Sequence, residues 1–355
     1  MRFGENVTID TAVCWLPTTR QSAASQVSDG VLSPAESAQS GVVEVPVAVE
    51  HAAPEMAVLA GRRALRQAGV APTDVDVLFH SWTYHQGHDF WSPAHYVADG
   101  VGAVNAVPVG IAQMCHGGAM ALHEAALHLC ADPSARAALV TTGDRFQRPG
   151  FDRWTSDSHV AYGDGATAAV LSRSGRGLRL LAQTVRAAPD MESMYRGDDA
   201  FSPAPMEHSR PVDVRRTKKA FAAAGGMARF AELAPVAIGA LVASALAQAG
   251  LAPGDRRVRH VLLPRLGPAT LERTYLPALE RQLPHATVHR PGARTGHLGS
   301  GDILANLSVV HSEALVAAGE VALLLSGGGG FTWSCTVVGR GSGPDGSAGD
   351  GAAPC

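Results

Sequence analysis

The sequence predicts a duplicated α/β fold, because one pattern of helix, turn and strand occurs twice. Residues 64–72 read Ala-Leu-Arg-Gln-Ala-Gly-Val-Ala-Pro and residues 245–253 read Ala-Leu-Ala-Gln-Ala-Gly-Leu-Ala-Pro, and a short apolar strand follows each. A second pair relates residues 162–171 to residues 327–338, where a glycine-rich turn enters an apolar strand. Two repeats in the same order indicate two similar halves that each mix strands with helices.

In the first half, residues 7–13 predict a strand, and the stretch from Thr18 to Ser40, rich in Ser, Ala and Gln, predicts a polar loop. Apolar residues at helical spacing predict a helix over residues 53–68, which Gly69 ends. The nearly continuous apolar run at residues 75–79 is typical of a buried strand.

In the second half, residues 234–249 predict a helix, residues 261–263 a strand, and residues 303–318 a further helix. We therefore expect an N-terminal half over residues 1–175 and a C-terminal half over residues 176–340.

The last stretch, residues 341–355, consists mainly of Gly, Ser, Pro, Ala and Asp without a period. Such a composition predicts a disordered tail.

The composition narrows the class of protein. The chain has 355 residues, of which 46% are hydrophobic and 17% charged, with a net charge of −3. These values are typical of a soluble globular protein and give no electrostatic footprint for nucleic acid or an anionic membrane. We expect no transmembrane stretch and no signal peptide. The five scattered cysteines indicate neither a disulfide framework nor a zinc site, which favours a reducing cytoplasm.

A candidate nucleophile lies at the end of an apolar run, where Met114-Cys115-His116-Gly117-Gly118 precedes an Ala- and Leu-rich helix. This arrangement predicts a strand-to-helix turn with Cys115 at its apex. The free N–H groups and partial positive charge of a helix start favour a thiolate. A buried structural cysteine is the alternative, since free Cys is among the most buried residue types.

A second candidate stretch, residues 294–302, places His297 five residues before Asp302 in a glycine-rich turn that leads into a helix. A thiol, an imidazole that deprotonates it and a carboxylate that fixes the imidazole tautomer form the Cys-His-Asp arrangement of acyl transfer. The alternatives are a loop histidine that bonds backbone and an aspartate that only caps the helix. His116 adjoins Cys115, but adjacent side chains on a turn usually diverge, so His297 is preferred as the base.

Several motifs resemble the thiolase superfamily, and more narrowly the β-ketoacyl-acyl carrier protein synthase III group. Met114-Cys115 with Gly117-Gly118 stands where that family carries its acylated cysteine. Residues 138–144 resemble its strand after the nucleophile helix, residues 162–166 its Gly-Asp-Gly-Ala turn, and residues 328–333 its C-terminal signature. The resemblance implies the thiolase fold, a duplicated five-layer α-β-α-β-α architecture, and a homodimer.

The sequence departs from the family at the residues that its members use for decarboxylative condensation. Condensing enzymes of this group pair the cysteine with a histidine after a Val-Pro or Leu-Pro step and an asparagine after a glycine. Here Leu263-Pro264 leads to Arg265, and Gly296 is followed by His297. Decarboxylative condensation is therefore not expected.

This pattern resembles the synthase III-like acyltransferases of antibiotic tailoring, such as the cervimycin malonyltransferase type. The resemblance implies transfer of an acyl group, with malonyl as one candidate, from an acyl carrier protein or coenzyme A thioester. The acyl group would pass through Cys115 to a hydroxyl of a polyketide glycoside, with His297 and Asp302 assisting. The backbone N–H groups of Cys115 and Gly329 would form the oxyanion hole. No permanently bound cofactor and no metal are implied.

Substrate contacts are predicted for Arg265, Trp82 and Phe331. Arg265 could hold a carboxylate on the acyl chain, or it could be solvated or salt-bridged. Trp82 belongs to a segment rich in His and aromatic residues, residues 80–95, whose spacing matches no compact set of metal ligands. The family resemblance implies that this segment borders the acyl pocket and the dimer partner, as an acceptor-binding or pocket wall. Two basic groups are either solvated surface or a docking site for a carrier protein or coenzyme A: Arg145, Arg148 and Arg153, and Arg215, Arg216, Lys218 and Lys219.

Two other functions remain open. The chain could be a starter-unit ketosynthase or priming enzyme that forms a carbon–carbon bond. It could also be a catalytically silent partner that binds a carrier protein, although a scaffold has no need of a reactive thiol at this turn.

Overall fold

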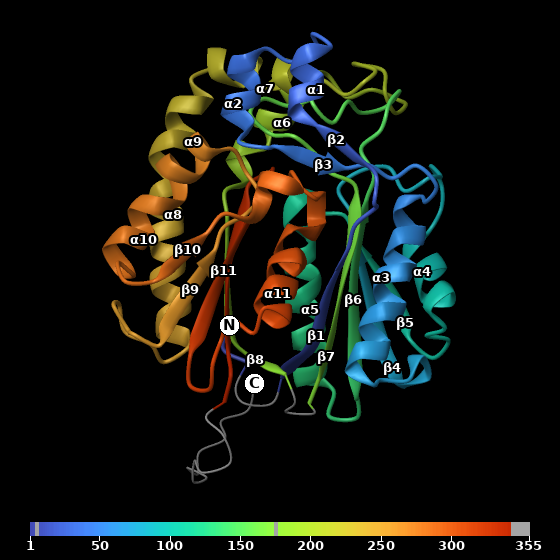
Figure 1. Cartoon of the computed structure of the whole chain (residues 1–355), viewed down its shortest axis with the longest axis vertical. Coiled ribbons are helices and arrows are strands. Elements are labelled where there is room, and N and C mark those ends of the chain that lie inside the picture. The colour runs from blue at the N-terminus through green and yellow to red at the C-terminus, as the bar shows by residue number, and fades with distance from the viewer. Residues whose placement is uncertain (4–6, 174–176, 342–355) are drawn as a thin grey trace.

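A sheet of ten strands runs through the protein (Figure 1). We analyse a computed structural model, which describes residues 1–3, 7–173 and 177–341. The sheet consists of β1 (Thr8–Trp15), β4 (Val75–Ser81), β5 (Val107–Ile111), β6 (Ala137–Asp144), β7 (Gly165–Ser172), β8 (Leu178–Ala187), β9 (Val258–Leu262), β10 (Thr287–His289), β11 (Val321–Gly328) and β12 (Thr332–Gly339). A separate antiparallel pair joins β2 (Arg20–Ser22) to β3 (Glu44–Pro46).

The helices of the described residues are α1 (Ala23–Ser28), α2 (Pro34–Ser40), α3 (Ala53–Ala68), α4 (Pro93–Val101), α5 (Gly117–Ala131), α6 (Ser193–Arg196), α7 (Val214–Ala223), α8 (Gly226–Gln248), α9 (Pro268–Thr270), α10 (Leu276–Gln282) and α11 (Asp302–Ser312). Short 3₁₀ turns occupy Pro72–Asp74, Met114–His116, Pro189–Met191, Pro291–Arg294 and Gly299–Gly301, and a π-helical turn occupies Leu271–Tyr275.

The strand order is symmetric about its centre. It reads β10-β9-β11-β12-β8-β1-β7-β6-β4-β5, so that β8 corresponds to β1, β12 to β7, β11 to β6, β9 to β4 and β10 to β5. Parallel and antiparallel pairings match between the halves, and the halves join where β1 pairs with β8. The predicted boundary at residues 175 and 176 lies outside the described residues and stays a prediction, as does the tail over residues 342–355.

Five layers follow from how the helices cover the two halves of the sheet. α5 and α11 lie between the halves, and their apolar residues share one buried cluster with residues of both (Figure 1). α3 and α4 cover the outer face of the first half, and α8 and α10 cover the outer face of the second. α5 is rich in Ala and Leu on most sides, as expected of a helix buried between the two halves of the sheet.

The expected polar loop over residues 18–40 is wrong, because this stretch contains β2, α1 and α2. Serine side chains begin both helices: Ser22 caps α1, and Ser33 forms a capping box with Glu36 at the start of α2. The Ser-rich composition that suggested a loop therefore supplies helix caps instead. The helix expected over residues 53–68 is confirmed, and Gly69 ends it in the left-handed conformation.

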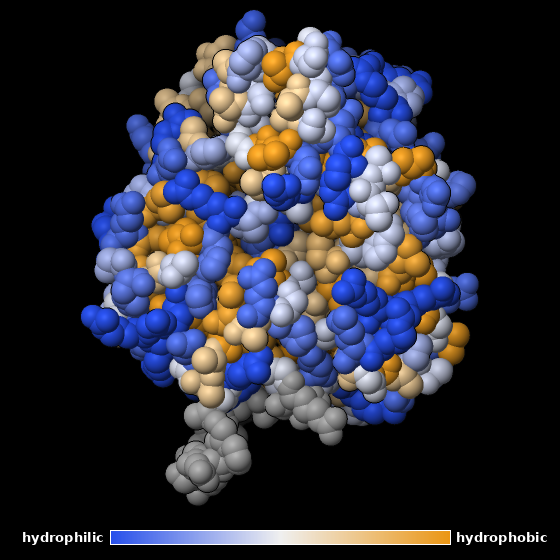
Figure 2. Space-filling view, in the orientation of Figure 1, coloured by the Kyte–Doolittle hydropathy of each residue, from blue (hydrophilic) through white to orange (hydrophobic). Residues whose placement is uncertain are grey.

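Two helix boundaries in the second half differ from expectation. α8 extends N-terminally through Pro235 to Gly226, and α11 ends at Ser312. α8 is also long and apolar enough to cross a membrane, contrary to the sequence expectation, although the core helix of a soluble protein passes the same test. It packs on β8, β12 and α10, and Figure 2 shows polar and apolar residues interspersed over the face in view.

Candidate active site

Cys115 lies in the predicted strand-to-helix turn. β5 ends at Ile111, and the 3₁₀ turn Met114–His116 leads directly into α5. Met114 has a φ of 48°, a left-handed conformation that is rare for a residue with a side chain and marks a tight turn before Cys115. Cys115 is 7% exposed and lines a cavity of about 400 Å³.

His297 and Asp302 form a buried pair at the start of α11. His297 Nδ1 lies 2.7 Å from Asp302 Oδ2, and both residues are 2% exposed. Asp302 also accepts hydrogen bonds from the backbone N–H groups of Leu298 and Arg265, each at 2.9 Å. Since His297 uses Nδ1 for the carboxylate, Nε2 is the nitrogen left for Cys115, whose side chain lies close enough to raise the pKa of His297.

The starts of α5 and α11 approach closely, and this contact brings Cys115 to His297. A Cβ atom at Gly118 would lie 2.2 Å from the carbonyl oxygen of Ser300, so only glycine allows this approach. Ser300 is held in turn by Asp144 at the end of β6, whose Oδ2 accepts from the Ser300 N–H at 3.1 Å.

Gly118→Ala is expected to lower the free energy of unfolding by about 3 kcal/mol, because the new methyl group meets rigid backbone. Gly239→Ala is the matched control. Gly239 lies in the interior of α8, and a Cβ atom there would find its nearest neighbour from the rest of the protein 3.8 Å away. We expect Gly239→Ala to be neutral or to stabilise by up to about 1 kcal/mol. Urea unfolding of both variants checks this, and equal stabilities would contradict it.

Charge and burial shift the pKa values of His297 and Asp302 in opposite directions. Burial is the largest influence on the pKa of His297 and lowers it, but the Asp302 carboxylate, the Cys115 thiolate and hydrogen bonds to both raise the pKa well above 6.5. Burial raises the pKa of Asp302, yet the charge and hydrogen bond of His297, with the charge of Arg265, hold this pKa below 3.8. The geometry therefore favours an imidazolium beside the Asp302 carboxylate.

This raised pKa predicts a pH dependence of stability. Because the folded protein holds the His297 proton more tightly than the unfolded chain, the contribution is complete below pH 6.5 and is lost as pH rises through the folded-state pKa. The free energy of unfolding should fall by up to about 1.4 kcal/mol per pH unit in that window. His297→Gln should remove this component, which urea titrations of both proteins at several pH values measure. A slope unchanged by the substitution would contradict the assignment.

Arg265 is not among the residues that line the cavity, so its predicted substrate contact is not supported. The residue is 6% exposed, and its guanidinium points to α11. Nη1 donates to the Asp302 carbonyl at 2.8 Å and to Asn306 Oδ1 at 2.6 Å, and Nε donates to Thr295 Oγ1 at 3.0 Å. Arg265 therefore supports the loop that carries His297 and Asp302.

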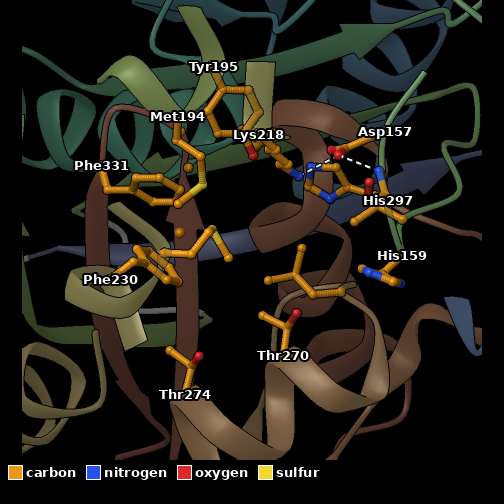
Figure 3. A pocket seen from close by; sticks show the side chains of 18 of the residues that line it. Asp157, His159, Met194, Tyr195, Lys218, Phe230, Thr270, Thr274, His297 and Phe331 are labelled. Atoms are coloured by element: carbon orange, nitrogen blue, oxygen red, sulfur yellow. Dashed lines mark hydrogen bonds and ion pairs between the residues drawn. The ribbon is translucent and has the colours of Figure 1, made fainter. Parts of the chain in front are cut away.

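The cavity has an apolar side and a polar side (Figure 3). Met194, Phe230 and Phe331 lie on one side, and Asp157, Lys218 and His297 on the other. Phe331, one of the predicted substrate contacts, lines the cavity, and Trp333 stacks on it with ring centroids 5.5 Å apart.

The glycine run at the end of β11 borders the cavity beside the nucleophile. Gly327, Gly328 and Gly329 line the cavity, and a Cβ at Gly328 would lie 2.5 Å from the His116 backbone nitrogen. A Cβ at Gly329 would collide with the Tyr195 ring at 2.6 Å. These glycines therefore allow the backbone to approach Cys115 and a substrate closely.

A polar cluster beside His297 escaped the sequence analysis. Asp157 accepts the Tyr162 hydroxyl at 2.9 Å and pairs with Lys218, whose ammonium lies 5.2 Å from the centroid of the Tyr195 ring. The Tyr162 ring contacts the His297 ring edge-on at 5.2 Å, and the backbones of the two residues form an isolated bridge. Nothing in the local sequence around Asp157 indicates this cluster, which tertiary contacts assemble.

The His-rich segment does not reach the cavity. Trp82 stacks on His80 at 5.6 Å and lies against Gly110, so its predicted substrate contact is not supported. His80 is buried between Thr141 and Gln86, and burial lowers its pKa to about 4. In the part of the chain that the structure describes, no group of three His, Cys, Asp or Glu residues could hold a metal ion.

Most residues of the two basic groups form ion pairs with carboxylates of this chain, which offset part of the predicted docking charge. The ion pairs are Arg148 with Asp152, Arg153 with Asp164, Arg215 with Glu36, Arg216 with Asp199 and Lys218 with Asp157. Lys219 is exposed at the cavity.

The chain is similar to several known proteins. The family described as 3-oxoacyl-[acyl-carrier-protein (ACP)] synthase III matches residues 109–189, which include Cys115. The β-ketoacyl-[acyl-carrier-protein] synthase III of Roseiflexus castenholzii is 28% identical over 291 residues, 80% of this chain and 82% of that protein. The solved structure of the acyltransferase ChlB3 superposes with a TM-score of 0.85 at 29% identity, covering 95% of this chain and 98% of that one.

The chain is synthase III-like. It has the thiolase fold that its motifs predict, and the proteins it resembles include synthases and an acyltransferase. The priming β-ketosynthase of the R1128 polyketide pathway shares the fold, with a TM-score of 0.74 at 20% identity over 95% of this chain and 97% of that one. At this identity the likeness shows the shared fold alone.

Proposed function

We propose that the protein is an acyltransferase that moves an acyl group from a carrier protein or coenzyme A thioester, through Cys115, to a hydroxyl of a natural-product glycoside. The observation that carries the proposal is the buried His297–Asp302 pair, with Nδ1 and Oδ2 2.7 Å apart beside Cys115. A carboxylate on Nδ1 keeps Nε2 available as a general base, as acyl transfer to oxygen requires.

Two half-reactions follow from this arrangement. In the first, Cys115 Sγ attacks the donor thioester, a new C–S bond forms, and the donor thiolate leaves with the proton from His297 Nε2. In the second, Nε2 takes the proton of the acceptor hydroxyl while its oxygen attacks the acyl carbon. The bond to Sγ then breaks, and Nε2 returns its proton to the leaving sulfur. Asp302 holds the imidazole in place and stabilises its charged form.

The oxyanion of both half-reactions is assigned to the backbone N–H groups of Cys115 and Gly329. Gly329 supports this role because it lines the cavity next to the 3₁₀ turn that carries the nucleophile. Losing one such donor typically costs about 2.7–4 kcal/mol of transition-state stabilisation. Phe331 would contribute to the apolar wall along the substrate.

The rival function is a starter-unit ketosynthase, and the shared fold with the R1128 priming enzyme is compatible with it. The residue types at positions 265 and 297 argue against this function. Arg265 stands in place of the condensing histidine, and its guanidinium donates hydrogen bonds to Asp302 and Asn306. His297 stands in place of the asparagine. We place the protein in the cytoplasm as a homodimer without a permanently bound cofactor.

The deciding experiment offers the purified protein a panel of acyl thioesters with glycoside acceptors and measures ester product and carbon dioxide together. We expect ester formation and essentially no carbon dioxide from malonyl thioester. Carbon dioxide in step with a new carbon–carbon bond would establish the ketosynthase instead. Failure of every donor to form an adduct on Cys115 would favour the silent carrier-binding partner.

A further inference from the structure

A second cavity, of about 270 Å³, lies at the end of the sheet away from Cys115. β12 begins beside the active-site cavity, which Trp333 lines, and ends at the second cavity, which Gly339 and Arg340 line. At about 3.3 Å per strand residue, the stretch from Trp333 to Gly339 separates the two linings by roughly 20 Å. The described linings share no residue, so the second cavity is distinct from the proposed acylation site.

Four arginines from separate parts of the chain line this second cavity, which we call the arginine cavity. They are Arg2 next to β8, Arg179 within β8, Arg257 before β9 and Arg340 after β12. Glu320 is the one acidic side chain in the described lining, and it pairs with Arg259, an arginine outside that lining, at 3.5 Å. Since the whole chain has a net charge of −3, this concentration of positive charge is local.

Carboxylates of the chain offset only part of the charge in the arginine cavity. Arg257 is held by Asp255, with Nη2 and Oδ2 2.7 Å apart. Arg2 and Arg340 form no ion pair and no side-chain hydrogen bond in the described part of the chain. Like charges that converge repel one another, so an anion bound between these guanidinium groups would replace repulsion by attraction.

The rest of the lining suits the carbon part of a small ligand. Leu181, Ala249, Leu251 and Val321 supply apolar atoms beside the arginines. Leu251 and Val321 are each 5% exposed, so they form a fixed part of the wall. The volume lies near the lower end of the range of about 300–1,000 Å³ that is usual for small-molecule pockets.

We propose that the arginine cavity binds a phosphorylated small molecule, with Arg2 and Arg340 as its phosphate-binding residues. The planar guanidinium fork matches the oxygens of a phosphate and donates two parallel hydrogen bonds to them. A phosphate ester also carries more negative charge and more acceptor oxygens than a carboxylate, which suits a site with several arginines. The apolar side chains would contact the carbon atoms of the ester.

Isothermal titration calorimetry of the full chain tests this proposal with phenyl phosphate, inorganic phosphate and benzoate. We expect phenyl phosphate to bind with a Kd below about 1 mM at an ionic strength of about 0.15 M, held constant with sodium chloride. Inorganic phosphate lacks the apolar contacts and benzoate lacks the phosphate, so each should bind at least about tenfold more weakly. Weaker binding of phenyl phosphate than this limit would overturn the proposal. Equal affinity for either of the other two ligands would overturn the class of ligand.

Variants place the binding site. Arg2→Gln and Arg340→Gln should each raise the Kd of phenyl phosphate about tenfold, because each removes charged hydrogen bonds to the phosphate. Arg273→Gln is the matched control, since Arg273 is an exposed arginine of the active-site cavity, and it should leave this Kd unchanged.

An unchanged Kd in both Arg2→Gln and Arg340→Gln would overturn the proposal. Loss of binding in Arg273→Gln alone would place the phosphate in the active-site cavity and would overturn it as well. Arg2 and Arg340 are exposed, so their replacement leaves the core intact, and thermal unfolding verifies this. Should one of the two variants not fold, the other decides.

Discussion

Cys115→Ala is expected to abolish the covalent acyl adduct and to reduce ester formation by about 10⁶-fold, the loss seen when an acyl-transfer triad loses its nucleophile. The thiol is the atom that carries the acyl group between donor and acceptor, and no other cysteine lines the described part of the cavity. Intact-mass spectrometry after incubation with a neutral acyl thioester measures the adduct directly, and chromatography measures the ester.

Cys14→Ala provides the control for this variant. Cys14 lines a separate cavity with Arg63 and His311, and burial raises its thiol pKa to about 11, which makes it a poor nucleophile. We expect its replacement to leave the adduct intact. An adduct that persists in Cys115→Ala and disappears in Cys14→Ala would place the nucleophile elsewhere.

Asp302→Asn is expected to lower the rate of acyl transfer by about 10⁴-fold. An amide N–H facing His297 Nδ1 would force the proton onto Nε2, and the imidazole could then no longer accept a proton from the acceptor hydroxyl. His297→Ala removes the base itself and should cost about 10²–10⁴-fold. Steady-state ester formation measures both variants, and thermal unfolding verifies that each remains folded.

Thr295→Val is the matched control for the loop. Thr295 Oγ1 accepts from Arg265 Nε at 3.0 Å and lies two residues from His297 without forming part of the pair. Activity close to that of the parent is expected. Full activity in His297→Ala would reject the proposed triad.

The central pair could be predicted from the sequence because its signals are local. Cys115 lies among glycines at a strand-to-helix junction, and His297 and Asp302 are five residues apart in one turn, so short-range geometry and family resemblance both apply. The repeat predicted the symmetric sheet because each copy contains its own helix, turn and strand.

The walls of the cavity could not be predicted in the same way. Asp157, Tyr162 and Lys218 meet only through the packing of α7 against the chain before β7, and no spacing in the sequence expresses that contact. Arg265 shows the complementary error. Its place in the motif was known, but the direction of its guanidinium depends on Asn306, a residue 41 positions away that also bonds the Leu263 carbonyl.

The meeting of α5 and α11 has a consequence for how such a protein can diversify. The residues proposed for bond making come from these two helix starts, which the innermost layer fixes against both halves of the sheet. The apolar wall comes instead from α6, α8 and the turn after β11. Substitutions in that wall can therefore change which acyl group fits while the reacting atoms keep their positions. Related proteins with this architecture can therefore differ in substrate while they keep the same reacting groups.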